Sequence, residues 1–473
     1  MVLEIIYFLI LVSSILLVIL ENRRPGIAIF WVMVLMLLPV VGLVLYILFG
    51  KDHRSHRVIK PFEMRRLSIL CNEANEDSIV ALPGNGKYNK LVSMMRGAND
   101  SPLFTGNNVR IFTDFTPMFQ AMLDDIAAAQ SYVHIQFYKI ENDEVGRQLA
   151  NLMIEKARQG VDVRLMYDSF ANLFVRRTYY KMMRQGGVKV HSFLKFIPSI
   201  FTRDVNCRTH RKIVVVDGTV GYTGGMNIAR RYRDGINNGV WRDTHIRIAG
   251  PAVSQLEVAL LADWRFCTKE LLDDPKYFPT PSVPVQPDGQ GSLLQIVTSG
   301  PMDSWASVMQ GMVQAIAQCQ RYLWIQTPYF IPTEPILLAL RNAAIAGVDV
   351  RLMIPATGDR GVLMLRASES YFQEIMQAGI KVYLYRNGYL HAKTMVCDDD
   401  FVTIGSTNFD NRSMGQNFEA NAFIYDSAVA ARQRDIFLDD QSQCTLVEPD
   451  QWRLRSFWRR LVQGFARLLT PLL

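Results

Sequence analysis

The sequence is poor in the residues and patterns that mark several common functional classes. Its six cysteines stand apart from one another, with no CxxC pair and no paired His/Cys spacing. Neither a disulfide framework nor a zinc knuckle is predicted, and reduced, buried thiols are expected. The chain also contains no P-loop and no dinucleotide-binding glycine pattern. A reaction that consumes a nucleotide is therefore not indicated.

The composition also lacks the signs of disorder and of an extreme polycation. Hydrophobic residues make up 49% of the 473 residues, and Lys+Arg exceed Asp+Glu by 51 − 44 = 7. A chain of this length is expected to form about two to four domains, at roughly 100–200 residues each. The modest positive charge favours an anionic partner, either phospholipid or nucleic acid.

Charge is absent from two long apolar runs near the N-terminus. The first extends from Ile5 to Leu20 and the second from Gly26 to Gly50, with a short turn between them. The second run exceeds the ~20 residues of a spanning helix, whereas the first is marginal and follows Glu4. A cleaved signal peptide is disfavoured because no basic segment precedes the first run. Residues 1–50 are therefore predicted to form a two-helix transmembrane hairpin.

The residues that follow the hairpin indicate on which side of the membrane the remaining chain lies. Basic residues close to a membrane span favour the cytoplasmic side. The turn between the two runs offers only two arginines, and the segment after the hairpin offers more. Its basic residues are Lys51, Arg54, Arg57, Lys60, Arg65 and Arg66. A cytoplasmic location is therefore predicted for the rest of the chain.

An internal repeat organises that remainder. The string GVDVRLM at residues 160–166 recurs letter for letter at residues 347–353, an offset of 347 − 160 = 187. In each half we expect an amphipathic helix (near residues 120–130 and 305–320), a strand, and a second helix that ends at the glycine of this string. Alternating strands and helices predict two α/β repeats. The expected segments are a basic juxtamembrane linker (51–105), the first repeat (106–274), a proline-rich linker (275–292), the second repeat (293–445) and a basic amphipathic C-terminal segment (446–473).

The pattern His-x-Lys-x-x-x-x-Asp stands late in each repeat. We expect both copies on strands, where a period of two places His and Lys on one face. A nucleophile and a phosphate-binding cation would then project together. A single copy would favour packing or surface roles, but two matched copies favour catalysis. The predicted catalytic residues are His210, Lys212, Asp217, His391, Lys393 and Asp398.

Small residues, amides and carboxylates follow each copy at matched distances. Gly225 and Asn227 in the first repeat correspond to Ser406 and Asn408 in the second. They suit a tight turn that brings backbone N–H groups and an amide toward an anion, so we predict that they bind substrate. Farther on stand Asp243 and Glu419. Either carboxylate could fix the tautomer of a catalytic imidazole.

These motifs resemble the phospholipase D superfamily over about residues 109–426, and bacterial cardiolipin synthases within it. The resemblance is carried by the segments Arg208–Lys212, Gly221–Ile228, Trp241–His245 and Asn408–Ser413. It implies two repeats packed as a pseudo-dimer in the bacterial inner membrane, acting on phosphatidylglycerol without metal or cofactor. Two phosphatidylglycerol molecules would give cardiolipin and glycerol through a phosphohistidine. By the same resemblance His210 is the nucleophile and His391 the acid/base, although the symmetry of the halves leaves this order open.

Other functions compete with this interpretation. A phospholipase D-type hydrolase would use the same phosphohistidine and differ only in the access of water. A nuclease fits the charge but not the predicted hairpin, so we expect no nucleic acid partner. A noncatalytic scaffold on anionic lipid is disfavoured by the two intact motifs. For the C-terminal segment, an interfacial helix on anionic lipid competes with a helix packed on the catalytic part. The oligomeric state stays open.

Overall fold

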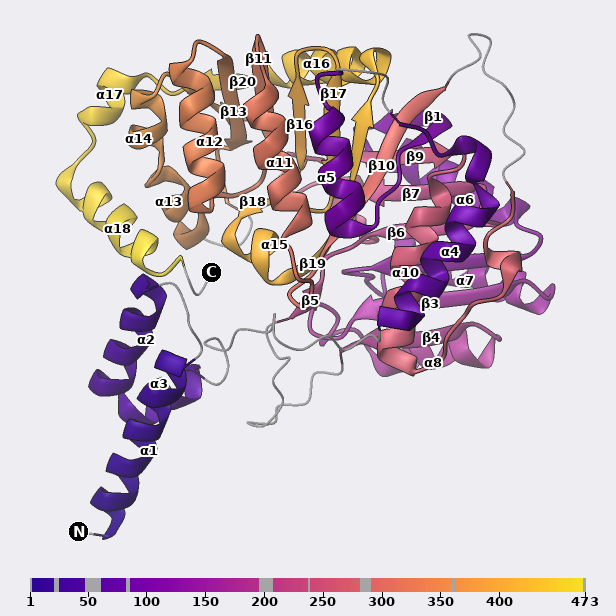
Figure 1. Ribbon diagram of the computed structural model, residues 1–473, viewed down its shortest axis with the longest axis horizontal. Helices are drawn as coiled ribbons and strands as arrows, with labels where there is room; N and C mark the ends of the chain where they lie inside the picture. Colours follow the sequence, from indigo (N-terminus) through magenta and orange to yellow (C-terminus); the bar gives the residue numbers. More distant parts are fainter. Residues whose placement is uncertain are drawn as a thin grey trace.

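A computed structural model describes residues 2–20, 25–46, 61–81, 86–194, 207–236, 239–280, 291–358 and 362–470 (Figure 1). Its centre is a continuous sheet in the order β20-β14-β13-β11-β16-β17-β19-β10-β1-β9-β7-β6-β2-β3-β4. The antiparallel pair β1–β10 joins the two repeats. The six strands beyond β1 correspond in order to the first six beyond β10, and β20 is an additional edge strand of the second repeat. The repeats therefore form the expected α/β pseudo-dimer around a shared sheet.

The strands of the two repeats have similar lengths and positions. In the first repeat they are β1 (Phe104–Phe112), β2 (Tyr132–Phe137), β3 (Asp162–Asp168), β4 (Lys189–Phe193), β6 (Ile213–Val216), β7 (Val220–Gly224) and β9 (His245–Ala249). In the second repeat they are β10 (Ser292–Ser299), β11 (Tyr322–Gln326), β13 (Asp349–Pro355), β14 (Lys381–Tyr385), β16 (Thr394–Cys397), β17 (Phe401–Gly405), β19 (Asn417–Tyr425) and β20 (Cys444–Leu446). Five short strands complete the set: β5 (Arg208–Thr209), β8 (Val240–Arg242), β12 (Phe330–Ile331), β15 (Gly388–Leu390) and β18 (Phe409–Asp410).

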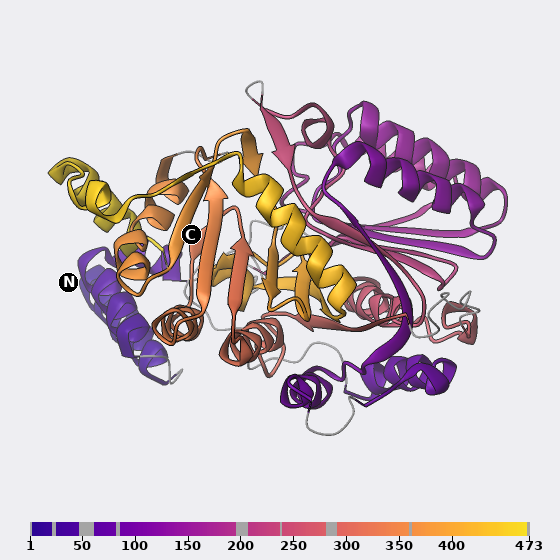
Figure 2. The same cartoon turned by 90° about the horizontal axis from the view of Figure 1, so that it is seen from above.

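Helices cover both faces of the sheet (Figures 1 and 2). Those of the first repeat are α6 (Phe115–Ala128), α7 (Glu144–Arg158), α8 (Arg177–Gln185), α9 (Arg230–Asp234) and α10 (Val253–Thr268). Those that follow are α11 (Ser307–Gln318), α12 (Glu334–Ile345), α13 (Val362–Glu369), α14 (Phe372–Gln377), α15 (Asn411–Gly415), α16 (Ser427–Gln441), α17 (Pro449–Arg453) and α18 (Phe457–Leu468). Helices α6 and α11 confirm the two helices expected near residues 120–130 and 305–320.

One apolar core is shared by the two repeats. It contains Leu256 and Leu260 from α10 together with Ile296, Ile404 and Phe437 from the second repeat, all of them at most 1% exposed. Two further cores lie mainly in one repeat each, although the core of the first repeat includes Tyr389 and that of the second includes Leu91 and Met95 of α5. Burial of apolar side chains is the main stabilising contribution in folding, and here it extends across the repeat boundary. The repeats therefore pack as one body.

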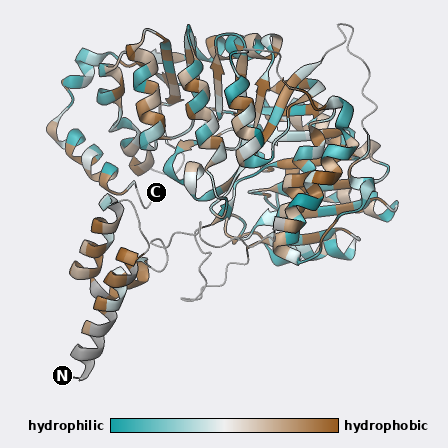
Figure 3. Cartoon of the chain, viewed as in Figure 1, coloured by the Kyte–Doolittle hydropathy of each residue, from teal (hydrophilic) through white to brown (hydrophobic). Residues whose placement is uncertain are grey.

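The N-terminal helices are α1 (Val2–Leu20), α2 (Pro25–Leu37) and α3 (Pro39–Leu45). They pack on one another through Val18, Trp31, Leu35 and Tyr46. Figure 3 shows them hydrophobic along most of their length. Among the described residues, no helix meets the length and hydropathy required to cross a membrane. The transmembrane hairpin is thus not confirmed and stays a prediction.

The structure corrects the expected linker at residues 51–105. Its described part contains helices α4 (Pro61–Ala74) and α5 (Asn89–Asn99), which pack on the catalytic part. Helix α4 lies on α10, where Glu63 forms an ion pair with Arg265. The side chain of Asn99 in α5 is hydrogen-bonded to the backbone of Thr298. The linker prediction failed because the short charged helices lack the long periodic pattern of a core helix.

The remaining boundaries shift by a few residues. Strand β1 begins at Phe104, before the expected first repeat, and β20 ends at Leu446, after the expected second repeat. The short helix Pro275–Tyr277 begins the proline-rich linker, and β10 starts at Ser292. Residues 281–290 of that linker, like Lys51, Arg54, Arg57 and Lys60, lie outside the described residues.

Candidate active site

The two histidine motifs are held at the boundary between the repeats. Strand β5, just before His210, pairs in parallel with β19 of the second repeat. Strand β15, just before His391, pairs in parallel with β8 of the first. The backbone N–H of His210 donates to the carbonyl of Phe418 (2.8 Å), and that of His391 donates to the carbonyl of Arg242 (2.6 Å). Each histidine thus lies beside the opposite repeat.

This arrangement differs from the expected placement of both motifs on strands. The residues from His210 to Lys212 lie between β5 and β6, and those from His391 to Lys393 lie between β15 and β16. In each case the chain first pairs with a strand of the other repeat, passes through the His-x-Lys residues, and then pairs with a strand of its own repeat. The sequence could not show this switch, because both ladders depend on contacts with residues about 150–210 positions away.

His210 contacts a carboxylate of the second repeat. Its Nδ1 lies 3.1 Å from the carboxylate of Glu419 and 2.9 Å from the carbonyl oxygen of Ser406. A carbonyl oxygen only accepts hydrogen bonds, so Nδ1 carries the proton. In the neutral imidazole the lone pair is then on Nε2. This tautomer is the one required of a nucleophile that attacks through Nε2.

His391 has the reciprocal arrangement with the first repeat. Its Nδ1 lies 2.6 Å from Oδ2 of Asp243. The other oxygen of Asp243 accepts a hydrogen bond from the backbone N–H of Thr244 (2.7 Å). Each of the two imidazoles is therefore oriented by a carboxylate of the opposite repeat. The sequence identified both carboxylates but left open which histidine each one serves.

Burial and nearby charges shift the pKa values of these groups. Burial lowers the pKa of His210 to about 4, and Lys212 and Lys393 act in the same direction against Glu419. Burial raises the pKa of the Asp243 carboxyl, despite the nearby charges of both lysines. Burial acts the same way on Glu419, but His210 and Lys212 outweigh it and lower its pKa. Lysines of both repeats thus influence the pKa values of His210 and Asp243. With a pKa of about 4, His210 is neutral at neutral pH.

The two lysines supply positive charge to a site lined with aromatic rings. Lys212 is fully buried and Lys393 is 2% exposed. The Nζ of Lys212 donates to the carbonyl of His210 (2.6 Å), and that of Lys393 donates to the carbonyl of His391. Two buried ammonium groups favour an anionic substrate. The rings near the two imidazoles are Tyr138, Tyr232, Trp241 and Tyr389.

Gly225 and Ser406 lie against the carboxylates. The hydroxyl of Ser406 donates to Glu419, and its backbone carbonyl accepts from His210. At the corresponding position of the first repeat, a Cβ on Gly225 would overlap the carboxylate of Asp243. Ser406 therefore binds the carboxylate of Glu419, and Gly225 leaves the space that the carboxylate of Asp243 occupies. Their predicted role in substrate binding stays a prediction.

The two asparagines have neighbours of different kinds. Asn227 donates to the hydroxyl of Tyr232 (2.6 Å) and accepts from the backbone N–H of Lys139 (3.2 Å). Asn408 donates to Asp410 (3.1 Å), and its Oδ1 is buried without a hydrogen-bond partner in the described structure. Their predicted contact with the phosphoryl group also stays a prediction.

The structure places Asp217 and Asp398 away from the two histidines, and their predicted catalytic role stays a prediction. Asp217 stands at the far end of β6 from His210 and accepts hydrogen bonds from the backbone N–H groups of residues 130, 131 and 132. Asp398 accepts from those of residues 320, 321 and 322 and from Lys87 (2.6 Å). Both aspartates therefore fix the turn before the first parallel strand of their repeat. The motif spacing contains a sign of this that the sequence analysis did not use, because five residues of extended chain span about 16 Å and place the aspartate far from the lysine.

Comparison with known proteins identifies the family. The family described as "Cardiolipin synthase, PLD-like domain" matches residues 122–261 and 312–441. The family described as "Phospholipase_D-nuclease N-terminal" matches residues 5–51. The major cardiolipin synthase of Bacillus subtilis (strain 168) is 35% identical over 480 residues, which is 99% of this chain and 98% of that protein. The chain belongs to the cardiolipin synthase family of the phospholipase D superfamily.

Other members of the cardiolipin synthase family are similarly related. A cardiolipin synthase of Geobacillus sp. (strain WCH70) is 35% identical and covers 96% of this chain and 90% of that protein. Among solved structures, phosphatidylserine synthase of Haemophilus influenzae Rd KW20 matches with a TM-score of 0.60. It is 16% identical and covers 81% of this chain and 98% of that one. This last likeness supports the duplicated fold alone.

Behind each carboxylate of this cardiolipin synthase family member lies a buried arginine that the sequence analysis missed. Arg211 forms an ion pair with Asp263 (2.9 Å) and donates to the carbonyl of Glu419 (3.1 Å). Arg242 forms an ion pair with Asp440 (2.8 Å) and donates to the carbonyl of Asp243. The search for matched positions missed the arginines, because they stand at different positions in the two repeats.

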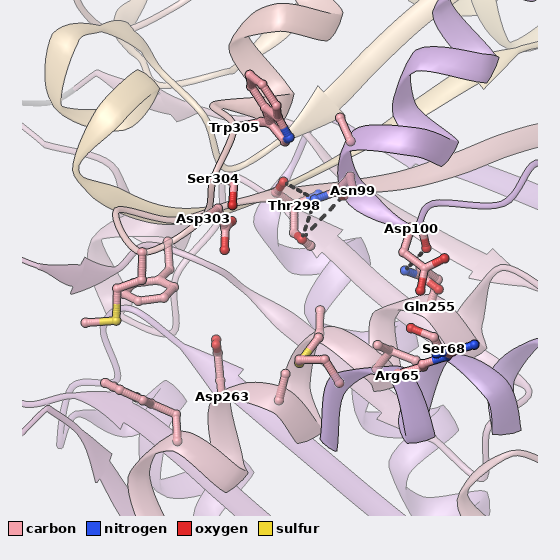
Figure 4. A pocket seen from close by; sticks show the side chains of 18 of the residues that line it. Arg65, Ser68, Asn99, Asp100, Gln255, Asp263, Thr298, Asp303, Ser304 and Trp305 are labelled. Atoms are coloured by element: carbon pink, nitrogen blue, oxygen red, sulfur yellow. Dashed lines mark hydrogen bonds between the residues drawn. The ribbon is translucent and has the colours of Figure 1, made fainter. Parts of the chain in front are cut away.

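A cavity of about 450 Å³ adjoins the Arg211–Asp263 pair (Figure 4). Helices α4, α5 and α10 surround it, with Arg65, Asn99, Gln255 and Trp305 in its wall. Its described lining includes neither catalytic histidine. The reaction is therefore not assigned to this cavity.

Proposed function

We propose that the chain is a cardiolipin synthase that transfers a phosphatidyl group from one phosphatidylglycerol to another, giving cardiolipin and glycerol. The observation that carries the proposal is the crosswise pairing of two imidazoles with two carboxylates beside two buried lysines. This constellation provides a nucleophile, an acid/base and positive charge for an anionic phosphodiester. The family relationship supports the same reaction.

In the first step Nε2 of His210 attacks the phosphorus of one phosphatidylglycerol. An N–P bond forms while the P–O bond to the terminal glycerol breaks, and His391 gives its proton to the departing glycerol oxygen. The depressed pKa of His210 supports its role as nucleophile, because the imidazole attacks without first losing a proton. The contact of His391 with Asp243 supports its role as acid, because a carboxylate stabilises the imidazolium form.

In the second step a hydroxyl of the next phosphatidylglycerol attacks the same phosphorus. His391 takes the hydroxyl proton, the N–P bond breaks, and cardiolipin leaves. Lys212 and Lys393 stabilise the negative charge on the phosphoryl oxygens in both steps, with Asn227 and Asn408 proposed as further donors. Exchange of one phosphodiester for another conserves bond type, so the reaction needs no nucleotide.

We also propose that the enzyme is a multi-pass protein of the inner membrane with its catalytic part in the cytoplasm. Helices α1–α3 support membrane insertion through large apolar side chains that remain exposed after the helices pack. Examples are Phe8 (62%), Ile29 (60%) and Val40 (71%). Exposed apolar surface of this extent favours contact with lipid. Arg65 and Arg66, in the first half of α4, support the cytoplasmic side.

The test is to incubate the purified full chain with phosphatidylglycerol alone and to identify the products by mass. Cardiolipin and glycerol in equal amounts are expected. Phosphatidic acid with glycerol and no cardiolipin would show hydrolysis, with water in place of the lipid hydroxyl, and would contradict the proposal. The double variant His210→Ala/His391→Ala controls for copurifying activity.

A further inference from the structure

Helix α18 is amphipathic, but its polar face is the one that contacts the protein. Gln463 and Ala466 are buried against the catalytic part. Arg459 forms an ion pair with Glu369 (2.8 Å) and Arg467 forms one with Glu374 (3.1 Å). Glu369 also accepts a hydrogen bond from Gln463 (2.8 Å). The helix is thus docked through charge and hydrogen bonds onto α13 and α14.

The opposite face of α18 carries large apolar side chains that point away from the protein. They are Phe457, Trp458, Leu461, Phe465 and Leu468, with exposed fractions between 50% and 71%. Their spacing of three or four residues places them on one stripe of the helix. Such a surface is costly in water and marks a contact with a protein or a membrane.

We propose that this apolar face of α18 inserts into the lipid bilayer beside the N-terminal hairpin; the inference rests on the proposed function. Figures 1 and 2 show α18 and the hairpin at the same end of the molecule, and the hairpin projects away from the catalytic part there. Aromatic and leucine residues on one face of a basic helix are typical of interfacial helices. The apolar face of α18 and the apolar hairpin therefore contact one membrane.

The arginines divide into two groups in this arrangement. Arg459 and Arg467 bind glutamates of the catalytic part, and Arg455 donates to Gln373 (3.1 Å). Arg453 and Arg460 are exposed and lie near the expected level of the lipid head groups. The predicted interfacial role and the predicted packing role thus belong to opposite faces of one helix. Insertion depends mainly on the apolar stripe rather than on anionic head groups.

A site-specific fluorescent label tests the insertion. In the full chain with Cys267→Ser and Cys444→Ser, an environment-sensitive probe is attached at Phe465→Cys or, as a matched control, at Leu338→Cys. Leu338 lies on α12 and is 56% exposed, similar to Phe465 at 60%. The protein is reconstituted in phosphatidylglycerol vesicles with and without brominated acyl chains.

We expect a blue shift and at least twofold quenching by brominated lipid at position 465, with neither change at position 338. A water-exposed, unquenched probe at 465 would overturn the proposal. A shielded probe that brominated lipid does not quench would show that protein, such as a second copy of the chain, covers this face, and would overturn it too. Product analysis in the same vesicles separates this result from the proposed function, because the quenching needs no turnover.

A second inference comes independently from the two buried arginines. Arg211 links the backbone of Glu419 in the second repeat to Asp263 in the first. Arg242 links the backbone of Asp243 in the first repeat to Asp440 in the second. Asp263 and Asp440 each accept a further hydrogen bond from a glutamine, Gln136 or Gln326, at 2.7 Å. The two networks therefore match in geometry.

The two arginines of the matching networks stand at different places in the sequence: one follows a histidine and the other precedes a carboxylate. Arg211 follows His210, where the second repeat has Ala392 after His391. Arg242 precedes Asp243, where the second repeat has Phe418 before Glu419. The guanidinium of Arg211 lies 5.6 Å from the centre of the Phe418 ring, so the two positions occupy neighbouring space. An arginine at either of these two positions could therefore reach the same region of the site.

We infer that Arg211 and Arg242 are positioning residues that hold the backbone of the carboxylates which orient the catalytic histidines. Arg211→Lys keeps the charge beside Asp263 but cannot span both partners. It should lower kcat at least tenfold with little change in KM or thermal midpoint. Arg211→Ala/Phe418→Arg reproduces the arrangement of the other repeat and should recover most of the kcat lost in Arg211→Ala.

The pH profile separates positioning from simple stability. A displaced Glu419 stabilises the imidazolium of His210 less, so the acid limb of kcat/KM should move to lower pH in Arg211→Lys. Parental kcat and an unchanged acid limb in Arg211→Lys would overturn the inference. A folded Arg211→Ala/Phe418→Arg enzyme no more active than Arg211→Ala would also overturn it.

Discussion

The two histidine sites are built from the same parts but differ in the carboxylate and in the residue packed against it. At His210 the carboxylate is Glu419, which accepts a hydrogen bond from Ser406. At His391 it is Asp243, which lies against Gly225 where a side chain would not fit. The two sites therefore differ both in the carboxylate and in the residue beside it. The two imidazoles therefore have different surroundings, although they occupy corresponding positions in the two repeats.

Loss of either imidazole should have the largest effect. We expect His210→Ala and His391→Ala each to lower cardiolipin formation by roughly a thousandfold or more, because residues that act as a unit have no substitute. Membrane association should stay unchanged, since neither side chain lies in α1–α3. Turnover measured by product mass checks this. Near-parental activity of one variant would show that the sites do not work as a pair.

Removal of charge from the carboxylates should rank next. We expect Glu419→Gln and Asp243→Asn to lower kcat by roughly a hundredfold to ten-thousandfold, because an amide fixes imidazole orientation and charge poorly. The pH dependence of kcat/KM distinguishes the two carboxylates further. In the parent, kcat/KM should fall only as the pH approaches about 4, where His210 gains a proton.

In Glu419→Gln the acid limb should move to still lower pH. Glu419 raises the pKa of His210, so its neutralisation lowers that pKa further. Asp243→Asn lacks this direct effect and serves as the matched control. An acid limb that moves to higher pH in Glu419→Gln would contradict the assignment of Glu419 to His210.

Substitution of Gly225 and Ser406 tests how strongly each carboxylate depends on the small residue beside it. Gly225→Ser should displace Asp243 and lower kcat by about a hundredfold, because the new side chain overlaps the carboxylate. Ser406→Gly removes one hydrogen bond to Glu419 and should lower kcat about fivefold, or by ~1 kcal/mol. Steady-state kinetics decides the order. If Ser406→Gly proved the more harmful, the hydrogen bond would outrank the close packing.

The motif aspartates should give the smallest catalytic effect and a clear effect on stability. Asp217→Asn and Asp398→Asn keep the side-chain shape, and asparagine tolerates the left-handed φ of 48° and 52° at these positions. Each loses charge-assisted hydrogen bonds to the backbone, which predicts destabilisation by about 1–3 kcal/mol. Asp398→Asn also loses the charge that pairs with Lys87. Thermal unfolding checks this, and an abolished kcat in the folded fraction would support the catalytic role of both aspartates.

The repeat allowed much of the fold to be predicted. Identical strings at residues 160–166 and 347–353 located β3 and β13, and the glycines at 160 and 347 end the helices with φ of +94° and +95° as expected. Local periodicity is sufficient for such elements. Helices α4 and α5 were missed, since their stability depends on contacts with α10 and α11 that no local pattern encodes.

The candidate site was predicted in its residue types but not in its connections. Matched spacing identified His210, His391 and both carboxylates, because duplication preserves spacing. The crosswise pairing was not available from the sequence, since each short ladder joins residues of different repeats. Arg211 and Arg242 were missed for a related reason. They perform matching roles from unmatched positions, which a comparison of the repeats cannot detect.

The division of labour between the two histidines can be measured most directly by trapping the intermediate. His391→Ala is mixed with a phosphatidyl ester of nitrophenol, whose leaving group departs without a proton, and the quenched protein is digested and mapped by mass. The account predicts one nitrophenolate released per chain and a phosphatidyl group on His210. His210→Ala, treated in the same way, should show no stoichiometric release. A phosphatidyl group on His391 of the His210→Ala variant, or no covalent adduct in either variant, would contradict the account.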